Sequence, residues 1–285
     1  MIRFLETITD KESYVSKRNA QFITEALGKK NVRFHKLQNS DVLSELNIDN
    51  DDILIAETRD GIVRHAISMY GCRNTVESDR TIVLTQNKEY VKSELQRHGI
   101  LSPRKITIEE VKEGYTYFVK PMFGEDSNFV DIDSVCQSKE EVRRKADVIQ
   151  KAGFTPMIEE FIGGEEYTVA LLMKEGKKEA YPIKVNLFTP WNIMTHAAKF
   201  SENEICEAVY NTRLEDIAKK AFDIVGCKHY MRIDFRRDSQ GRYYLIDFNL
   251  FPGLGPTDHF AKCMNLHLNI SYHDVLTKII ETATK

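Results

Sequence analysis

Apolar and polar residues alternate along two stretches near the end of the chain, residues 229–235 and 243–249. A period of two is typical of strands that are buried on one face only. The residues between them, 238–241, read Asp-Ser-Gln-Gly and favour a turn. The pattern therefore predicts an antiparallel hairpin whose apolar face carries Met231, Ile233, Phe235, Ile246 and Phe248.

The polar face of this hairpin carries Arg232 and Asp234 on the first strand and Asp247 and Asn249 on the second. A turn of four residues would place Arg232 opposite Asp247, with Asp234 as its diagonal neighbour, and such neighbours lie roughly 5–8 Å apart. Asp and Asn are depleted in strands, so their presence on one face calls for a reason. Two carboxylates and an amide oxygen are hard ligands and predict a site for Mg²⁺ or Mn²⁺; the alternative is a hairpin with one solvated face.

The rest of the chain alternates strand-like and helix-like patterns, which predicts an α/β (α+β) fold in three parts, residues 1–80, 81–172 and 173–285. The first part is expected to hold a parallel sheet, and ligands bind such sheets at the carboxyl ends of their strands. The polar loop Glu57–Gly61 follows a predicted strand and is therefore either a ligand site or a helix cap. The strands expected in this part are 2–5, 32–35 and 53–56, and its helices lie near 15–27, 41–46 and 62–69.

Capping signals organise the other two parts. A Ser or Thr stands three residues before a Glu at Thr107, Ser138 and Thr212, as in a capping box. Asn87 and Lys88 open another helix within the connector 81–103, and Gly226 ends the helix that starts at Thr212. Strands are predicted at 115–119, 157–162, 165–169 and 179–186, ahead of the hairpin.

Composition narrows the class of protein. The 285 residues are 42% hydrophobic and 29% charged, which is ordinary for a globular chain. A net charge of -3 gives no general bias toward nucleic acid or anionic membrane. Neither a signal peptide nor an apolar run long enough for a bilayer is present, and the five cysteines lack Cys-x-x-Cys pairing. A cytoplasmic protein with reduced thiols is expected, without a nucleic-acid or membrane partner.

Three sequence blocks in this order resemble the ATP-grasp superfamily, and within it the carboxylate–amine ligases such as D-alanine–D-alanine ligase. The first block is Lys120-Pro121 with the polar loop that follows, and the second is 159–169, Glu-Glu-Phe-Ile-Gly-Gly-Glu-Glu-Tyr-Thr-Val. The third runs from Arg232 through Asp247-Phe-Asn to Gly253. The resemblance covers roughly residues 85–260 and implies an ATP-grasp fold, with a small N-terminal α/β domain and two α+β subdomains that clamp ATP.

The resemblance also implies a role for particular residues in binding ATP. The loop 124–128 looks like a lid over the phosphates, to which Ser127 would donate a hydrogen bond. The other nucleotide contacts that it implies are Lys88 and Lys120 at the phosphates, Glu159, Phe161 and Ile162 at adenine, and Glu166 at the ribose hydroxyls.

The resemblance assigns the chemistry to residues of the third block and the loop before it. Asp234, Asp247 and Asn249 look like ligands of a pair of Mg²⁺ (or Mn²⁺) ions. Arg232 and the Gly253 N–H would stabilise the acyl phosphate and the oxyanion, while Lys199 resembles the lysine of a loop that closes over the site. The implied reaction activates one carboxylate with ATP and joins it to an amine, releasing ADP and phosphate.

Some residues depart from the pattern of D-alanine ligases. The lid loop carries Glu125 and Asp126, which repel phosphate, and Phe200 follows Lys199 where these enzymes tend to have Tyr. In the first 80 residues only Asp60-Gly61 matches their longer run, so Arg59 or Arg64 is a candidate for a substrate carboxylate. Trp191 and His196, before Lys199, either shape the amine pocket or are structural.

The expected partners are two small substrates, amino-acid-like or dipeptide-like, and the family resemblance suggests a homodimer. Two alternatives stay open at this point. An ATP-grasp phosphotransferase would stop at phosphorylation, and a catalytically silent ATP-binding regulatory protein would keep only the fold. Arg232 and the Pro252-Gly253 turn, placed to stabilise an oxyanion, count against the phosphotransferase. The full set of candidate lysines and metal ligands counts against the silent protein, which would be expected to have lost one of them.

Overall fold

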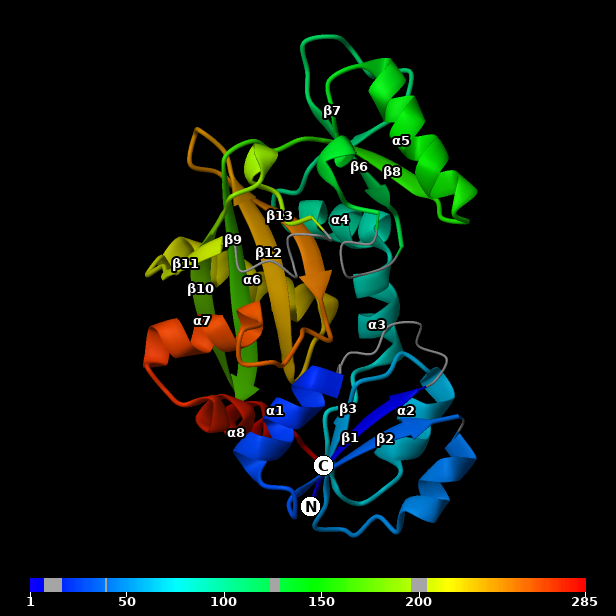
Figure 1. The fold of residues 1–285 in the computed structure, drawn as a ribbon, viewed down its shortest axis with the longest axis vertical. Coiled ribbons are helices and arrows are strands. Elements are labelled where there is room, and N and C mark those ends of the chain that lie inside the picture. Colours follow the sequence, from blue (N-terminus) through cyan, green and yellow to red (C-terminus); the bar gives the residue numbers. More distant parts are fainter. Residues whose placement is uncertain (8–16, 39, 124–128, 196–203) are drawn as a thin grey trace.

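The computed structural model describes residues 1–7, 17–38, 40–123, 129–195 and 204–285. Three β-sheets follow one another along the long axis of the molecule (Figure 1). The N-terminal sheet lies at the bottom of this view, a five-stranded sheet occupies the middle, and a small sheet with one helix lies at the top. The two termini meet at the bottom, where Asn74 and Thr284 form a β-bridge.

The N-terminal unit is a parallel four-stranded sheet in the order β2-β1-β3-β4, which confirms the prediction for this part of the chain. Asp60 begins helix α2 by accepting hydrogen bonds from the backbone N–H groups of Ile62 and Val63. The helix expected near residues 41–46 is a 3₁₀ helix, η1. The elements of the unit are β1 (Ile2–Thr7), α1 (Lys17–Leu27), β2 (Val32–Leu37), η1 (Ser40–Leu46), β3 (Ile53–Ala56), α2 (Gly61–Ser68) and β4 (Arg73–Asn74).

Two consecutive helices, α3 (Asp79–Gln86) and α4 (Lys88–Arg97), connect this unit to the rest (Figure 1). Only α4 was predicted from the sequence. Asn87 separates the helices, since its extended backbone ends α3 while its side chain accepts from Tyr90 N and caps α4. Lys88 therefore stands in the first turn of α4, where the sequence placed it.

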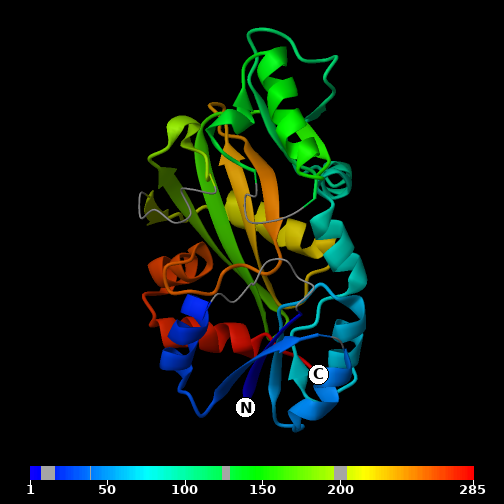
Figure 2. The same cartoon turned by 45° about the vertical axis from the view of Figure 1, so that its right-hand side comes forward.

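The small upper sheet has the order β5-β8-β6-β7 and is covered by helix α5 (Figure 2). Ser138 caps α5 by accepting from Glu141 N, as predicted. The predicted box at Thr107 starts no helix: Glu110 accepts from Thr107 N, but 108–110 form only a turn, and Gly114 at φ 81° soon redirects the chain. Its elements are β5 (Lys105–Ile106), β6 (Tyr117–Pro121), η2 (Ile132–Ser134), β7 (Val135–Cys136), α5 (Lys139–Lys151) and β8 (Pro156–Glu160).

The central sheet is antiparallel, in the order β11-β10-β9-β12-β13. The cap of α6 is Asn211, which accepts from Leu214 N, rather than the predicted Thr212, which is the first helical residue. Gly226 ends α6 in the left-handed conformation, as predicted. The elements are β9 (Glu165–Lys174), β10 (Lys177–Leu187), η3 (Pro190–Asn192), β11 (Glu204–Ala208), α6 (Thr212–Val225), β12 (Tyr230–Arg237), β13 (Tyr243–Asn249), α7 (His259–Leu268) and α8 (Tyr272–Glu281).

Each face of the central sheet packs on different helices. Val169 and Leu171 belong to a buried cluster with α4 and α6, whereas Ala170 and Leu172 pack with α7 and α8. Thr168 precedes Ala170 on the same face and pairs with Asp234 of β12, so this face continues as a polar surface. The candidate site described below lies on that polar continuation.

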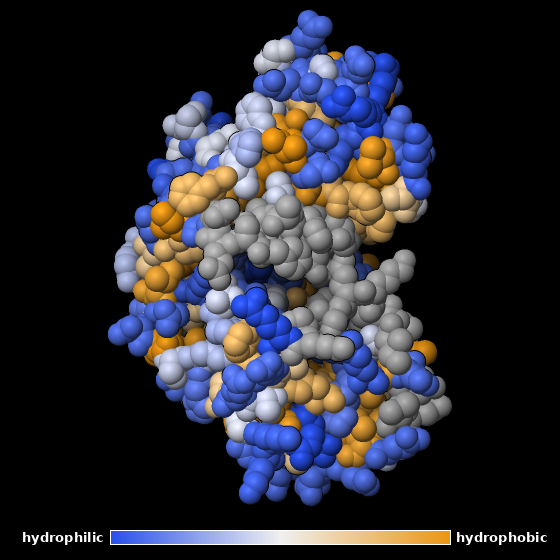
Figure 3. All heavy atoms as spheres, in the orientation of Figure 1, coloured by the Kyte–Doolittle hydropathy of each residue, from blue (hydrophilic) through white to orange (hydrophobic). Residues whose placement is uncertain are grey.

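None of the described helices combines the length and the apolar character that crossing a bilayer requires. On the face shown in Figure 3, hydrophobic residues occur in separate groups among hydrophilic ones.

Candidate active site

The predicted hairpin is present as β12 and β13, with the predicted polar residues on one face. On the other face Met231, Ile233, Phe235 and Phe248 join a buried cluster as predicted, but Leu245 takes the place predicted for Ile246. The predicted register of the hairpin is wrong. Arg232 lies opposite Asn249, and Asp234 lies directly opposite Asp247. Two causes add up: the loop between Arg237 and Tyr243 has five residues rather than four, and a β-bulge follows Asp234.

The bulge places Ile246 out of the regular pairing, because Leu245 pairs with Phe235 and Asp247 with Asp234. Lys120, on β6 of the upper sheet, donates a hydrogen bond to the Ile246 carbonyl, with 3.2 Å between Nζ and O. The irregularity therefore brings a lysine predicted to bind phosphate next to the carboxylates of the hairpin.

Asp234 is the candidate metal ligand that makes the most hydrogen bonds to other side chains of the protein. Arg232 donates to both of its carboxylate oxygens, at 3.0 Å each, and the Thr168 hydroxyl donates to Oδ1 at 2.5 Å. Burial favours the neutral acid, but the Arg232 guanidinium outweighs it and holds the pKa of Asp234 below its usual range. The Arg232 charge is thus already paired, on the face predicted for it.

The other two candidate ligands are open to a cation. The Asp247 side chain is 36% exposed, and its Oδ1 lies 3.8 Å from Lys88 Nζ. Asn249 Oδ1 is buried and has no hydrogen-bond partner among the described residues. A buried amide oxygen without a partner costs free energy unless something binds it, so a hard cation fits this group of oxygens.

Lys88 and Lys120 reach the same place from different elements. Lys88 extends from the first turn of α4 and Lys120 from β6, and both residues are 7% exposed. Burial opposes the charge on Lys120, but the carboxylates of Glu159 and Asp247 raise its pKa. Two ammonium groups therefore border the carboxylate pair, which is the charge distribution expected at a phosphate and metal site.

The Glu159 side chain lies between two lysines, and its predicted contact with adenine stays a prediction. Its carboxylate is 2% exposed and lies between Lys92 Nζ, which donates to Oε1, and Lys120 Nζ, 3.2 Å from Oε2. Burial alone would raise the pKa of Glu159, but the two lysines lower it. Burial also lowers the pKa of Lys92 to about 8.

Lys92 was not predicted as a site residue, although a signal was available. It follows Lys88 by four residues in a helix and so lies on the same face of α4. Nothing in the sequence indicated that this face would meet Glu159, which is 67 residues away.

Arg236 is the second functional candidate that the sequence analysis missed. It is 4% exposed and donates to Glu166 Oε2 at 2.9 Å, while its guanidinium lies 5.0 Å from the centre of the Phe161 ring. It also donates to the carbonyl of Ile162 at 2.5 Å. One arginine thus fixes three of the residues predicted to contact the nucleoside, together with the backbone carbonyls of Gly164, Trp191 and Asn192.

Gly253 lies in a tightly built loop between β13 and α7. A Cβ atom at this position would lie 2.5 Å from Asp258 Oδ2, so a larger residue would displace that carboxylate. Asp258 Oδ2 accepts from Gly255 N at 2.6 Å and from Asn19 Nδ2 at 3.0 Å. The loop is therefore held to helix α1 of the N-terminal unit, beside the hairpin.

The two candidate arginines of the N-terminal unit differ in their surroundings. Arg64 is buried and donates to the Arg59 carbonyl and to Asp79. The Arg59 guanidinium lies 5.9 Å from the centre of the Phe251 ring, in the segment that leads to Gly253. Arg59 is therefore the better placed of the two to meet a substrate at the hairpin.

Comparison with known proteins identifies the family to which these features belong. Residues 82–281 match the family model described as the D-ala D-ala ligase C-terminus. The chain belongs to this family. It is 26% identical over 245 residues to a D-alanine–D-alanine ligase of Chromohalobacter salexigens, covering 79% of this chain and 74% of the relative. A D-alanine–D-alanine ligase of Francisella philomiragia is 27% identical over 227 residues, 74% and 73% of the two chains.

Solved structures of a D-alanine–D-alanine ligase and of a D-Ala:D-Ser ligase share the fold across nearly the whole chain. The enzyme of Bacillus anthracis in complex with ATP has a TM-score of 0.75 at 20% identity, covering 99% of this chain and 96% of that one. The VanG D-Ala:D-Ser ligase of Enterococcus faecalis has a TM-score of 0.73 at 15% identity, with 98% of each chain covered. The predictions of an ATP-grasp fold and of an ATP-dependent carboxylate–amine ligase are confirmed.

Several residues to which the sequence analysis gave a role in this member of the D-alanine–D-alanine ligase family lie outside the described residues. They are Ser127, Glu125 and Asp126 of the predicted lid loop, and His196, Lys199 and Phe200 of the loop before β11. Their predicted roles stay predictions.

Proposed function

We propose that the protein joins the carboxylate of one small amino acid to the amine of another, at the expense of ATP and with Mg²⁺ or Mn²⁺. One observation carries the assignment of the site. The opposed carboxylates of Asp234 and Asp247 lie next to the ammonium groups of Lys88 and Lys120, together with the Asn249 oxygen, for which no other described residue is a hydrogen-bond partner. Hard oxygen ligands beside paired cations suit a metal–triphosphate complex.

The residues divide the work of binding the nucleotide. Lys88 and Lys120 would neutralise phosphate oxygens as point charges, and Lys120 is held in place by Glu159 and the Ile246 carbonyl. Phe161, Ile162 and Glu166 would form the nucleoside pocket, with their positions fixed by Arg236. Metal ions held by Asp234, Asp247 and Asn249 would supply charge neutralisation at the transferred phosphoryl group.

The second half of the reaction needs positive groups at the activated carboxyl carbon. Arg232 would share its charge between Asp234 and the oxyanion that forms when the amine attacks. The Gly253 N–H would donate to the same oxyanion, because the absence of a side chain leaves room beside Asp258. Arg59 would hold the carboxylate of a substrate from the side of the N-terminal unit.

The test measures ADP release with ATP and Mg²⁺ against a panel of L- and D-amino acids, singly and in pairs, with mass spectrometry of the products. We expect release to require two amino acids and to yield a dipeptide mass. Release with a single carboxylic acid and no amide product would indicate a phosphotransferase instead. ATP binding without turnover on any pair would count against the ligase assignment for the substrates sampled.

Two matched variants test the metal assignment. Asp247→Asn removes one proposed metal ligand, and we expect a loss of at least about a hundredfold in kcat, since such ligands neutralise transition-state charge. Asp216→Asn makes the same chemical change on the exposed face of α6 and should leave activity unchanged. Full activity in Asp247→Asn would refute the metal site. An Arg59→Ala variant should raise the KM of an amino-acid substrate and leave the KM of ATP alone.

A further inference from the structure

A second group of candidate metal ligands lies away from the carboxylates of the hairpin. Glu204 and Cys206 stand two residues apart on β11 and therefore share a face of this edge strand, and His259 is the first residue of α7. His259 Nε2 lies 2.9 Å from Glu204 Oε2, and Cys206 Sγ lies 3.7 Å from Glu204 Oε1. One ligand atom from each of the three lies within 4.8 Å of the other two.

The donor types of this group differ from those of the proposed nucleotide site. A thiol, an imidazole and a carboxylate are the three side-chain ligands of zinc, whereas Mg²⁺ prefers oxygen alone. Ligand atoms around a tetrahedral zinc lie about 3.3–3.6 Å from one another, given zinc–ligand bonds of about 2.0–2.3 Å. The observed spacing requires only small side-chain movements to reach this geometry.

We propose that Glu204, Cys206 and His259 bind a zinc ion. On binding, Cys206 Sγ gives its proton to the solvent and forms the zinc–sulfur bond as a thiolate, and no electron transfer is involved. The site is distinct from the group Asp234, Asp247 and Asn249, and the proposal does not depend on the ligase assignment.

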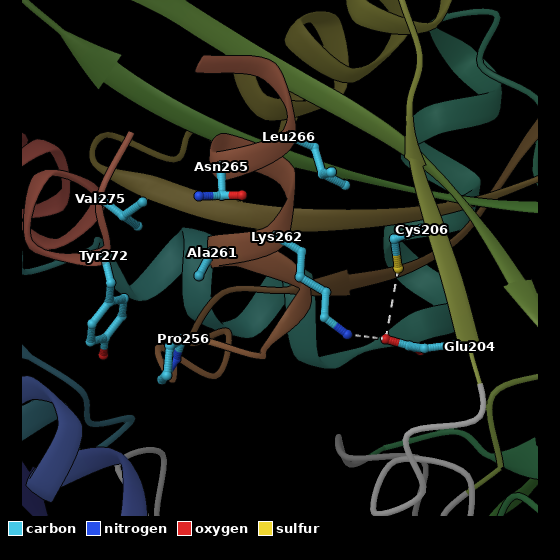
Figure 4. A pocket seen from close by; sticks show the side chains of 9 residues that line it. All are labelled: Glu204, Cys206, Pro256, Ala261, Lys262, Asn265, Leu266, Tyr272 and Val275. Carbon is cyan, nitrogen blue, oxygen red and sulfur yellow. Dashed lines mark hydrogen bonds and ion pairs between the residues drawn. The ribbon is translucent and has the colours of Figure 1, made fainter. Parts of the chain in front are cut away.

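Lys262 competes for the same site. Its Nζ lies 2.5 Å from Glu204 Oε1, so in the structure the ammonium group supplies the positive charge that the metal would bring (Figure 4). The Lys262 side chain is 30% exposed and extends from the surface of α7, which allows it to turn into solvent when the carboxylate binds zinc. Lysine and zinc therefore exclude one another at Glu204.

The surroundings leave room for a fourth ligand. Glu204 and Cys206 of β11 line a cavity of about 280 Å³ together with Lys262 and other residues of α7 and with residues of α8 (Figure 4). Three protein ligands with an open fourth position are the arrangement of zinc sites that retain a water molecule or accept an exogenous ligand. The four other cysteines are buried, so Cys206 is the thiol among the described residues that solvent ions can reach.

The position of the site links it to the neighbouring active-site loop. His259 directly follows Asp258, whose carboxylate holds Gly255 and lies over Gly253. A zinc ion would tie this end of α7 to the edge strand β11.

The primary test is isothermal titration calorimetry of the full chain with ZnCl₂. The buffer contains no chelator, and excess Mg²⁺ fills the sites that have oxygen ligands only. We expect one zinc ion per chain. Cys206→Ser and His259→Gln should each weaken zinc binding by more than about tenfold, the loss that even outer-shell partners of a metal site produce. Lys262→Met removes the competing ammonium group and should tighten binding.

Control variants separate this site from others. Glu207→Gln changes an exposed carboxylate on the same strand and should leave zinc binding unchanged, as should Asp247→Asn at the hairpin. A second measurement replaces zinc with Co²⁺, whose charge-transfer absorption with a thiolate should appear in the wild type and vanish in Cys206→Ser. Circular dichroism establishes that each variant is folded.

Three outcomes would overturn the proposal: no stoichiometric zinc binding, binding that survives both Cys206→Ser and His259→Gln in folded protein, or binding that is lost in Asp247→Asn. A fourth is unchanged affinity in Lys262→Met, which would contradict the competition between lysine and zinc and would place the metal elsewhere.

Discussion

Replacing Glu159 by glutamine should destabilise the protein strongly and in a way that depends on pH. The variant keeps the size and shape of the side chain and removes one buried negative charge. In the native structure this charge compensates two buried lysines, Lys92 and Lys120, which are 6% and 7% exposed. Without it, two positive charges would face one another away from water.

The magnitude follows from the geometry. Opposite unit charges 3.2 Å apart, the distance from Glu159 Oε2 to Lys120 Nζ, attract by about 5 kcal/mol at an effective dielectric constant near 20. Removing one partner of a buried ion pair costs about 3–5 kcal/mol of unfolding free energy. We expect a loss in this range at pH 6, where both lysines would have to carry their protons.

The pH dependence gives the prediction its sign. Burial already lowers the pKa of Lys92 to about 8, and the attraction of Glu159 is what limits this decrease. In the folded variant the pKa of Lys92 should fall below 8, so Lys92 gives up its proton at a pH at which the unfolded chain still keeps it. The unfolded state then binds more protons, so the stability of the variant rises with pH, by up to about 1.4 kcal/mol per pH unit. The difference from wild type should shrink between pH 6 and pH 8.

The assay is urea unfolding at pH 6, 7 and 8, analysed by linear extrapolation. Glu160→Gln is the matched control, because Glu160 lies next in the same strand and accepts one hydrogen bond, from Arg104 N at 3.0 Å in an exposed position. This control should lose at most about 1 kcal/mol, as for an ordinary hydrogen bond. A loss below about 1 kcal/mol for Glu159→Gln at pH 6, or a loss that is equal at pH 6 and pH 8, would refute the reasoning.

Two further predictions concern stability. Gly164→Ala should lower the free energy of unfolding in urea by about 1–3 kcal/mol or more, because φ at Gly164 is +111° and the new Cβ would overlap the Arg237 carbonyl. Gly163→Ala adds a Cβ in open space and should be nearly neutral, so equal stability of the two variants would contradict this reasoning. The wild type should become more stable between pH 8 and pH 10.5, because in that range the unfolded chain keeps the Lys92 proton that the native protein has lost. Lys92→Met should lack this rise. Parallel pH profiles of stability for the two proteins would show that Lys92 does not titrate in that range.

Much of the site was accessible to sequence reasoning because local rules governed it. The alternation along 229–249 predicted which side chains of each strand share a face, and Arg232, Asp234, Asp247 and Asn249 were grouped correctly because the longer loop and the bulge together shift the register by two residues, which keeps the same faces together. The cap at Ser138 and the end of α6 at Gly226 were likewise determined by a few neighbouring residues. The ordered blocks then identified the fold and the family.

Other features depended on competition between distant segments. The register of the hairpin was predicted wrongly because it depends on the bulge after Asp234. This bulge forms where β12 also pairs with β9 and where Lys120 donates to the Ile246 carbonyl. Lys92 and Arg236 resemble ordinary surface charges in the sequence. Only their burial against Glu159 and Glu166 shows that they hold those carboxylates.

By itself, the sequence determined the periodicities, the caps at Ser138 and Gly226 and the family, since each is encoded by residues close together or by ordered blocks. The tertiary structure decided the register, the charge partners and the grouping of Glu204, Cys206 and His259. The physical reason is that buried charges and irregular pairing are stable only where groups from several elements meet, and such meetings leave no local pattern in the chain.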